Sequence, residues 1–170
     1  MKHEFKRQTI ALLDEHRIMT IATNRPDGWP QATIVGYVND GLIIYCLIGR
    51  DSQKFANIAR DPRVSLAIAN DYPQPLQIRG LSIAARAVEV ADQGEREHAA
   101  ALLLRRYPEY KVMPRPDPAA VPTMRLTPEV VSILDYAKGF GHTDLVRVSD
   151  ADLAEFAEAR RHHWATFHAA

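Results

Sequence analysis

The stretch 42–66 reads LIIYCLIGRDSQKFANIARDPRVSL, and it limits the folds open to this chain of 170 residues. The apolar run Leu42–Leu47 predicts a strand, which a polar turn follows. Ser52 is placed to cap a short helix over 53–59, because a serine hydroxyl can accept a backbone N–H of the first helical turn. A second strand over 64–69 then completes a strand–helix–strand unit.

The turn before this helix brings cations and a hydroxyl together in the sequence. Arg50, Ser52 and Lys54 lie beside backbone N–H groups that have no partner within the helix. Such a combination of donors and positive charge is suited to a phosphate. A capped helix with solvated charges is the simpler interpretation of the same residues, because most clusters of surface charge are solvated.

Turn signals on both sides of this unit indicate an antiparallel β protein. Asn24–Gly28 predicts a turn between two strands, and Asp40-Gly41 suits the tight turn of a second hairpin. The absence of a G-x-G-x-x-G motif and of repeated β-α-β alternation excludes a Rossmann domain. We therefore expect an antiparallel barrel with helices packed outside it. Further strands are expected over 18–23, 31–38, 76–90, 123–126, 130–135 and 145–148, and further helices over 2–16, 92–106 and 149–167.

Composition excludes several classes of function. Lys+Arg and Asp+Glu both number 21, and a chain without net charge lacks the basic surface that general nucleic-acid binding needs. No apolar run approaches the roughly 20 residues of a membrane-spanning helix, and the N-terminal residues lack the apolar core of a signal peptide. The adjacent His162 and His163 would face different sides of a helix, so no metal site is expected. With a single cysteine, Cys46, these features predict a cytoplasmic protein that binds neither nucleic acid nor membrane.

Four segments, taken in order, carry a likeness to one protein family. They are the hairpin PQATIVGYVNDGLIIYCLIG, the helix start S-Q-K at 52–54, the phrase NIARDPRVSLAIA, and RLTPEVVSILDYAKGFGHTDLV near the end. Their order resembles the pyridoxamine 5'-phosphate oxidase-like family of FMN-binding split barrels, in which S-R-K stands as the phosphate motif. The resemblance runs from about Ile10 to about Val148, which is most of the chain.

The resemblance implies a fold, a cofactor and an assembly. The implied fold is α+β, mainly β: one domain over 1–170 that forms an antiparallel Greek-key split β-barrel with flanking helices. The implied assembly is a homodimer that binds FMN in a groove between its subunits and acts as an oxidoreductase on a small molecule. The deazaflavin F420 or haem in place of FMN, or a flavin-binding sensor or carrier without turnover, are the alternatives.

Carried over by position, the resemblance also implies which residues contact the cofactor. Lys54 and Ser52 would hold the FMN phosphate with help from Arg50, and Gln77 or Arg79 would reach the cofactor from the partner subunit. The flavin would lie along the strand after Pro30 and beside the end of the neighbouring strand. The full set of expected contacts is Gln31, Ala32, Thr33, Ile34, Tyr45, Cys46, Leu47, Arg50, Ser52, Lys54, Gln77 and Arg79.

Several of these residues have a structural interpretation as well. Arg79 would favour reduced flavin as a cation near N1, or would form a surface ion pair. Cys46 is expected to be a core residue, because no adjacent histidine or cation would lower its pKa. His142 and Trp29 are candidates for substrate contact. Their simpler interpretations are a histidine in a turn and an aromatic residue on the rim of the barrel.

The sequence departs from the family at positions that bear on the substrate. Gln31 stands where true pyridoxamine phosphate oxidases carry arginine, and Gln53 replaces the arginine of S-R-K. The spacer between Tyr45 and Ser52 is longer than in the family, and the Arg- and Trp-bearing segment that grips a pyridoxal-type substrate is not recognisable. These differences weigh against vitamin B6 oxidation more than they weigh against flavin binding.

Overall fold

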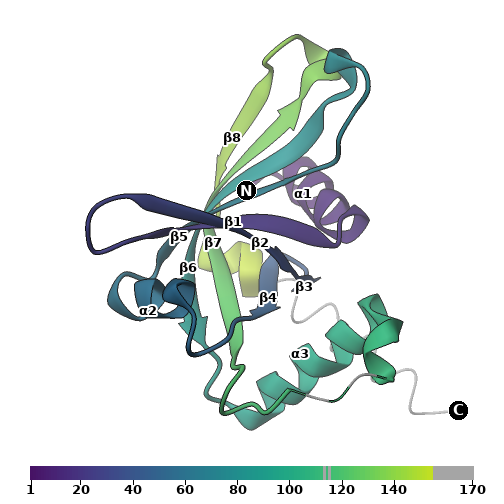
Figure 1. The fold of residues 1–170 in the computed structure, drawn as a ribbon. Helices are drawn as coiled ribbons and strands as arrows, with labels where there is room; N and C mark the ends of the chain where they lie inside the picture. Colours follow the sequence, from purple (N-terminus) through teal and green to yellow (C-terminus); the bar gives the residue numbers. More distant parts are fainter. Residues whose placement is uncertain (113, 115, 155–170) are drawn as a thin grey trace, which may run out of the picture.

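The computed structural model describes residues 1–112, 114 and 116–154. Figure 1 shows one curled sheet with helices packed around it. The described residues form eight strands, paired antiparallel in the order β2-β1-β5-β6-β7-β4-β3, and β8 pairs with β7 outside this path. The predicted fold class, a mainly β α+β split barrel with flanking helices, is confirmed.

Most elements begin and end within a few residues of their predicted bounds. The helices are α1 (His3–Glu15), α2 (Gln53–Arg60) and α3 (Gln93–Arg106). The strands are β1 (Ile18–Asn24), β2 (Pro30–Gly36), β3 (Val38–Asp40), β4 (Ile43–Leu47), β5 (Arg63–Ala69), β6 (Arg79–Glu89), β7 (Thr123–Asp135) and β8 (Thr143–Arg147). Short 3-10 helices occupy Pro75–Gln77, Pro108–Lys111 and Tyr136–Lys138.

A single residue joins the two ends of the strand order. The strand predicted over 31–38 is two strands, because the chain bends at Tyr37 and changes its pairing partner. Before the bend β2 pairs with β1, and after it β3 pairs with β4. Tyr37 is fully buried, and its hydroxyl donates to the carbonyl of Leu13 at 2.9 Å. The bend therefore draws the curled sheet towards a barrel.

Two other strand predictions need correction. β6 begins at Arg79 rather than at 76, since the 3-10 helix Pro75–Gln77 precedes it. β7 is one long strand where two short ones were expected. Pro128 is tolerated within it because the pairing shifts by a bulge at this point, opposite Ala85.

The C-terminal helix was predicted over 149–167. Residues 150–154 are helical, and the remainder of that prediction lies outside the described residues. None of the helices in the described part of the chain has the length and apolar character needed to cross a membrane.

The core fills the inner face of the curled sheet. Side chains alternate between the two faces of a strand, and the inward members of neighbouring strands meet in register. Ile21 of β1, Leu66 of β5, Ile83 of β6 and Val131 of β7 form such a row, and each is 1% exposed or less. Helix α1 packs its buried Leu13 against this core. The rigid sheet thereby holds the strands that carry the candidate site.

Candidate cofactor site

Helix α2 begins as the sequence predicts. The Ser52 hydroxyl oxygen accepts the backbone N–H of Phe55 at 3.2 Å, which is an N-cap. The same hydroxyl donates to the carbonyl of Gly49 at 2.6 Å. Ser52 thereby links the loop before α2 to the first turn of the helix and stabilises the start of α2 through its side chain.

Lys54 reaches from α2 to β2. Its Nζ donates to the hydroxyl of Thr33 at 2.9 Å, and the side chain is half-buried. Burial lowers the pKa of the Lys54 ammonium. No carboxylate of the described residues lies within ion-pair distance of it. Lys54 is therefore a partly desolvated cation whose protein partner is neutral, and an anion would satisfy it.

A chain of side-chain amides lies beside Lys54 and links α2 to β1 and β2. Asn57 is 1% exposed, and its Nδ2 donates to Thr23 Oγ1 at 3.0 Å and to Gln31 Oε1 at 3.1 Å. Its Oδ1 accepts from Gln53 Nε2 at 2.9 Å. Sequence reasoning missed Asn57 and Thr23. The available signal was a polar residue at a buried position of an amphipathic helix, which needs partners of its own.

Only part of the β2 segment faces this cluster. Gln31 and Thr33 are half-buried on the side of α2, whereas Ala32 and Ile34 point to the opposite face of the sheet. Ile34 is 70% exposed there. The structure thus brings Gln31 and Thr33 together with Lys54, as the sequence predicts, and separates the side chains of Ala32 and Ile34 from them.

The three predicted residues of β4 divide between two environments. β4 pairs with β3 and β7, so it is not the hydrogen-bonded neighbour of β2. Cys46 is fully buried in the core, and burial raises the pKa of its thiol to about 12, so the core interpretation is confirmed. Tyr45 and Leu47 lie on the other face and pack against α3, where the Tyr45 hydroxyl donates to Glu95 at 3.0 Å.

Arg50 is engaged on another side of its loop. Its guanidinium donates two hydrogen bonds to the Glu89 carboxylate, at 2.7 and 3.1 Å, and its Nε donates to the carbonyl of Ala119 at 2.9 Å. The guanidinium also lies over the Phe55 ring, 4.9 Å from its centroid. The hydrogen bonds to Glu89 raise the pKa of Arg50. The structure therefore uses Arg50 to hold a neighbouring loop and does not direct its guanidinium to Lys54.

Two residues were expected to serve a second subunit: Gln77 ends the 3-10 helix before β6, and Arg79 is the first residue of β6. Both side chains are exposed. Within the described part of the chain Arg79 forms no ion pair, so the surface pair considered as its alternative role is not formed there. Exposure leaves both residues available to another subunit.

The two candidate substrate residues lie in exposed turns. Trp29 is 71% exposed in the turn between β1 and β2. His142 follows the turn after β7, and its Nε2 lies 3.2 Å from Asp144 Oδ2. Hydrogen bonds from Lys138 and then from His142 hold the pKa of the Asp144 carboxyl below its usual range. His142 thus takes part in a local charge cluster, in keeping with its interpretation as a turn histidine.

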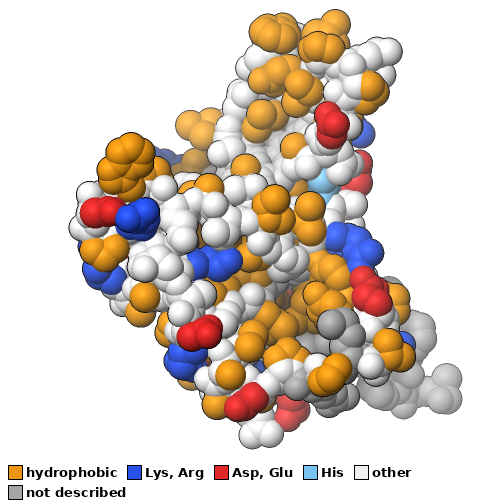
Figure 2. Space-filling model, viewed as in Figure 1, with side chains coloured by type: hydrophobic (Ala, Val, Ile, Leu, Met, Phe, Trp, Pro, Cys, Tyr) orange, Lys and Arg blue, Asp and Glu red, His pale blue; other side chains and the backbone are white. Residues whose placement is uncertain are grey.

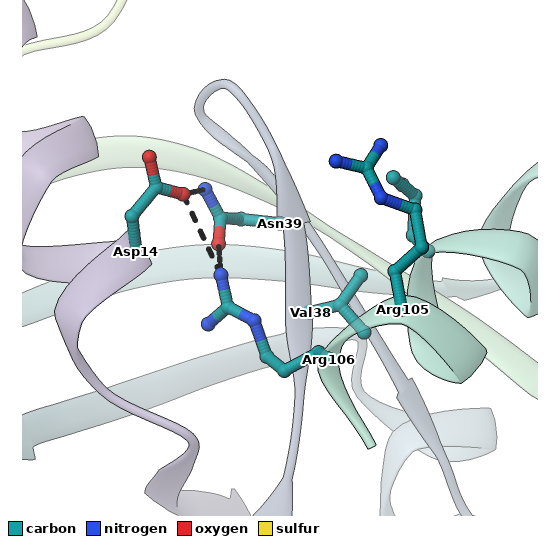
Figure 3. Close-up of a pocket in the computed structure, with 6 residues that line it drawn as sticks. Asp14, Val38, Asn39, Arg105 and Arg106 are labelled. Atoms are coloured by element: carbon teal, nitrogen blue, oxygen red, sulfur yellow. Dashed lines mark hydrogen bonds and ion pairs between the residues drawn. The ribbon is translucent and has the colours of Figure 1, made fainter. Parts of the chain in front are cut away.

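Two hollows lie apart from the Lys54 cluster. The smaller, of about 320 Å³, lies between α1, β3 and α3 (Figure 3). Arg106 donates there to Asn39 Oδ1 and to the Leu13 carbonyl, each at 2.9 Å, and Asn39 donates to Asp14 at 2.8 Å. These polar groups satisfy one another, so the hollow is a joint between three elements.

The larger hollow is a groove of about 840 Å³ between α3 and the proline-rich chain before β7. Its wall is mainly apolar and includes Leu47, Val90 and Leu103. Arg50 and Glu89 line it as well, but they neutralise each other. Arg96 and Glu97 line it too: Arg96 donates to the backbone carbonyls of Val90 and Ala91, and Glu97 accepts from Gln93. Among the described residues, each charged group of this wall thus has a hydrogen-bond partner within the protein.

A family model described as pyridoxamine 5'-phosphate oxidase matches residues 5–135, which is most of the chain. The chain belongs to this family. The family resemblance drawn from the sequence is thereby confirmed for the pyridoxamine 5'-phosphate oxidase family as a whole. No curated protein sequence matches the chain.

Solved structures show this fold in proteins with different ligands. A heme-binding protein from Mycobacterium smegmatis has a TM-score of 0.69 at 23% identity, over 89% of this chain and 59% of its own. General Stress Protein 26 from Bacillus anthracis has a TM-score of 0.64 at 16% identity, over 85% and 99%. A FAD-binding protein from Mesorhizobium loti has a TM-score of 0.60 at 20% identity, over 75% and 91%. At these identities the likeness establishes the fold alone.

Proposed function

We propose that this member of the pyridoxamine 5'-phosphate oxidase family binds FMN and acts as a flavin-dependent oxidoreductase on a small molecule. The observation that carries the proposal is Lys54, a half-buried ammonium whose protein partner is the neutral hydroxyl of Thr33. Among the described residues this cation has no counterion, and a phosphate dianion would supply one through a charge-assisted hydrogen bond.

The groups around Lys54 fit a phosphate-bearing cofactor. The Ser52 cap uses the N–H of Phe55, so the N–H groups of Gln53 and Lys54 at the positive end of α2 stay without an intrahelical partner. Within the described residues, Gln31 Nε2 has no hydrogen-bond partner either. Donors are thus in excess, and an acceptor-rich anion complements them.

A bound flavin would supply electron or hydride transfer. The chain's own residues would supply binding and orientation. Lys54 and the first N–H groups of α2 would hold the phosphate, and β2, which carries Gln31 and Thr33, would align the rest of the cofactor. Arg79 is exposed and unpaired within the described chain, and it is our choice for the cation that the partner subunit adds.

We further propose a homodimer, because one face of the sheet is covered by none of the described helices. A row of cross-strand neighbours on this face has no charged side chain, and its ends, Ile34 and Leu145, are 70% and 73% exposed. Figure 2 shows hydrophobic side chains over the end of the sheet formed by β7 and β8. Exposed apolar side chains such as Ile34 and Leu145, set in an uncharged face, are typical of an interface. The row is Ile34, Thr20, Ala67, Ser82, Ser132 and Leu145.

The dimer is tested by the molar mass of the protein in solution, measured by light scattering after size-exclusion chromatography. We expect a dimer for the wild type and a monomer for Ser82→Arg, which places a charge in the middle of the face. The control is Glu97→Arg, at an exposed position of α3 away from this row. A monomeric wild type would contradict the proposed assembly.

The cofactor is tested by the visible spectrum of the purified protein and by titration with FMN. We expect flavin bands or the uptake of added FMN, and then turnover with a reductant and an acceptor. Binding of haem or of F420 in place of FMN would contradict the proposed cofactor. Bound FMN without turnover on any acceptor would instead support a sensor or carrier.

Haem is the second candidate to test, because the solved structures include a haem-binding protein of the same fold. A haem iron needs an axial ligand. His98 and His142 each lie at hydrogen-bond distance from a carboxylate, at 2.8 Å from Asp40 and 3.2 Å from Asp144. Such a contact at one ring nitrogen is common in metal-binding histidines and leaves the other nitrogen available to iron. The visible spectrum therefore separates haem from the proposed flavin.

A further inference from the structure

The buried amide of Asn57 has a role beyond stabilising α2. We propose that Asn57 is the positioning residue of the cofactor seat: it holds the Gln31 side chain so that its NH₂ group faces the open space beside Lys54. Gln31 then donates to an acceptor oxygen of the bound cofactor. This inference rests on the proposed function, which supplies the cofactor.

Every hydrogen-bonding group of the Asn57 side chain is used. Its two N–H groups go to Thr23 on β1 and Gln31 on β2, and its oxygen accepts from Gln53 on α2. Asn57 and Thr23 are 1% and 2% exposed. A buried amide that moved would leave several groups unpaired, which is costly away from water. Asn57 is therefore held in one orientation by three elements.

The orientation of Asn57 determines that of Gln31. The Gln31 oxygen is occupied by Asn57 at 3.1 Å, so the NH₂ group is the free edge of this amide. That nitrogen is not among the buried polar atoms left without a partner, and the residue is half-buried. The NH₂ group therefore reaches solvent-accessible space and presents donors there.

Gln31 and Lys54 present their donors on the same side of β2. Gln31 and Thr33 are two positions apart, so their side chains share a face of the strand, and Thr33 is the residue that Lys54 contacts. The complementary ligand edge is an acceptor oxygen. A phosphoryl oxygen and a ring carbonyl oxygen of the cofactor both meet this requirement.

Positioning would raise affinity without adding a contact. A glutamine that is free to rotate must lose its rotamer freedom when a ligand binds, which weakens binding. In this protein the hydrogen bond from Asn57 fixes the Gln31 side chain before the ligand binds. Loss of Asn57 should thus weaken the cofactor contact of Gln31 even though Gln31 is still present.

The first test uses the ligand-free protein, so it does not depend on the cofactor. Side-chain ¹⁵N relaxation would compare the Gln31 amide with that of Gln77, which is exposed. We expect Gln31 to be ordered in the wild type and as mobile as Gln77 in Asn57→Ala. Equal mobility of the two amides in the wild type would overturn the positioning role, whether or not FMN binds.

The second test is a double-mutant cycle on FMN affinity with Asn57→Ala, Gln31→Ala and the double variant. Asn57→Ala should weaken binding about five-fold, the effect of one net hydrogen bond. In the Gln31→Ala background the same change should cost less than about two-fold, because its target is gone. An equal loss in both backgrounds would show that Asn57 does not act through Gln31.

Riboflavin, which lacks the phosphate, locates the acceptor. If Asn57→Ala weakens FMN but not riboflavin, Gln31 donates to the phosphate; if it weakens both, Gln31 donates to the rest of the flavin. Either pattern supports the positioning role. No loss for either ligand in a folded Asn57→Ala protein would overturn it.

A matched control separates positioning from stability. Asn39 is 4% exposed, and its Nδ2 donates to Asp14 and to the carbonyl of Gly41, on the joint between α1 and β3. Asn39→Ala should lower the free energy of unfolding while FMN affinity stays the same. Should Asn57→Ala not fold, Thr23→Val removes one acceptor of Asn57 at nearly constant volume. It should mobilise Gln31 in part, and an unchanged Gln31 would count against the proposal.

Discussion

Lys54 and Arg106 both reach from a helix to a neighbouring strand, but their hydrogen-bonding partners differ. Arg106 lines a hollow and donates to Asn39 (Figure 3). It also donates to the carbonyls of Leu13 and His16. Lys54 lines neither described hollow and has one neutral partner, Thr33. A hollow whose polar groups are paired has a structural explanation. A half-buried cation without a counterion among the described residues is explained by the ligand that we propose.

The largest expected effect is on stability, at Arg106. Arg106→Met keeps the apolar stem and removes the donors from the Leu13 and His16 carbonyls, so we expect a loss of about 3 kcal/mol in the free energy of unfolding. Denaturant unfolding measures it. Arg105→Met is the matched control, because the neighbouring Arg105 is exposed and points away from the cluster in Figure 3. A loss of FMN affinity in folded Arg106→Met would contradict the assignment of Arg106 to structure and of Lys54 to binding.

Lys54 should show the converse pattern. Lys54→Gln can still donate to Thr33 but has no charge, so we expect FMN affinity to fall about ten-fold, close to 1.4 kcal/mol. The free energy of unfolding should change by less than about 0.5 kcal/mol, because no ion pair is lost. Isothermal titration and denaturant unfolding measure the two quantities. Lys111→Ala, an exposed lysine, is the control, and equal affinities for Lys54→Gln and the wild type would remove Lys54 from the site.

The pH dependence of binding sharpens the same point. Burial lowers the pKa of Lys54, so the ammonium loses its proton at a lower pH than an ordinary lysine, whose pKa is about 10.4. The charge that attracts the phosphate is present below this pKa and is lost as the pH rises through it. FMN affinity should therefore fall as the pH rises from 7 towards that pKa. The phosphate of FMN ionises in the same way whether the wild type or Lys54→Gln is titrated. The part of the fall in affinity that comes from Lys54 should therefore be absent in Lys54→Gln.

Without a ligand, the sign for stability is opposite to that for binding. A folded-state pKa below the unfolded value means that the charged form of Lys54 disfavours folding. That cost is present below the folded pKa and is relieved as the pH rises through it. Lys54 should thus make the ligand-free protein slightly less stable near neutral pH than at higher pH, and circular dichroism melting curves of the wild type and Lys54→Gln would reveal the difference.

Local signals explain what the sequence could predict. The Ser52 cap, the turn before Pro30 and the Asp40-Gly41 hairpin each depend on residues a few positions apart, and the structure has all three. The bend at Tyr37 could not be predicted in this way. It depends on the partners β1 and β4, which come from different parts of the chain.

The same distinction separates the residues of the site. Lys54 could be proposed as a phosphate ligand because it lies next to a helix start with a recognisable cap. Asn57 was missed because its partners Thr23 and Gln31 lie 34 and 26 positions away. Arg50 looked like a phosphate ligand by proximity in sequence, and its actual acceptor is Glu89, 39 positions away. Side-chain partners across a sheet are set by strand register, which a single sequence does not reveal.

Arg50 gives the smallest expected effect and the closest check on the comparison. It precedes Lys54 by four positions and carries the same charge, but its guanidinium is paired with Glu89 at 2.7 Å. The Arg50 and Glu89 side chains are both well exposed, and exposed ion pairs contribute little to the free energy of unfolding. Arg50→Met should change FMN affinity by less than about two-fold and should leave the free energy of unfolding nearly unchanged. Affinity that instead fell as far as in Lys54→Gln would mean that Arg50 leaves Glu89 and binds the phosphate. An ion pair in the ligand-free protein would then no longer distinguish a structural cation from a cofactor-binding one.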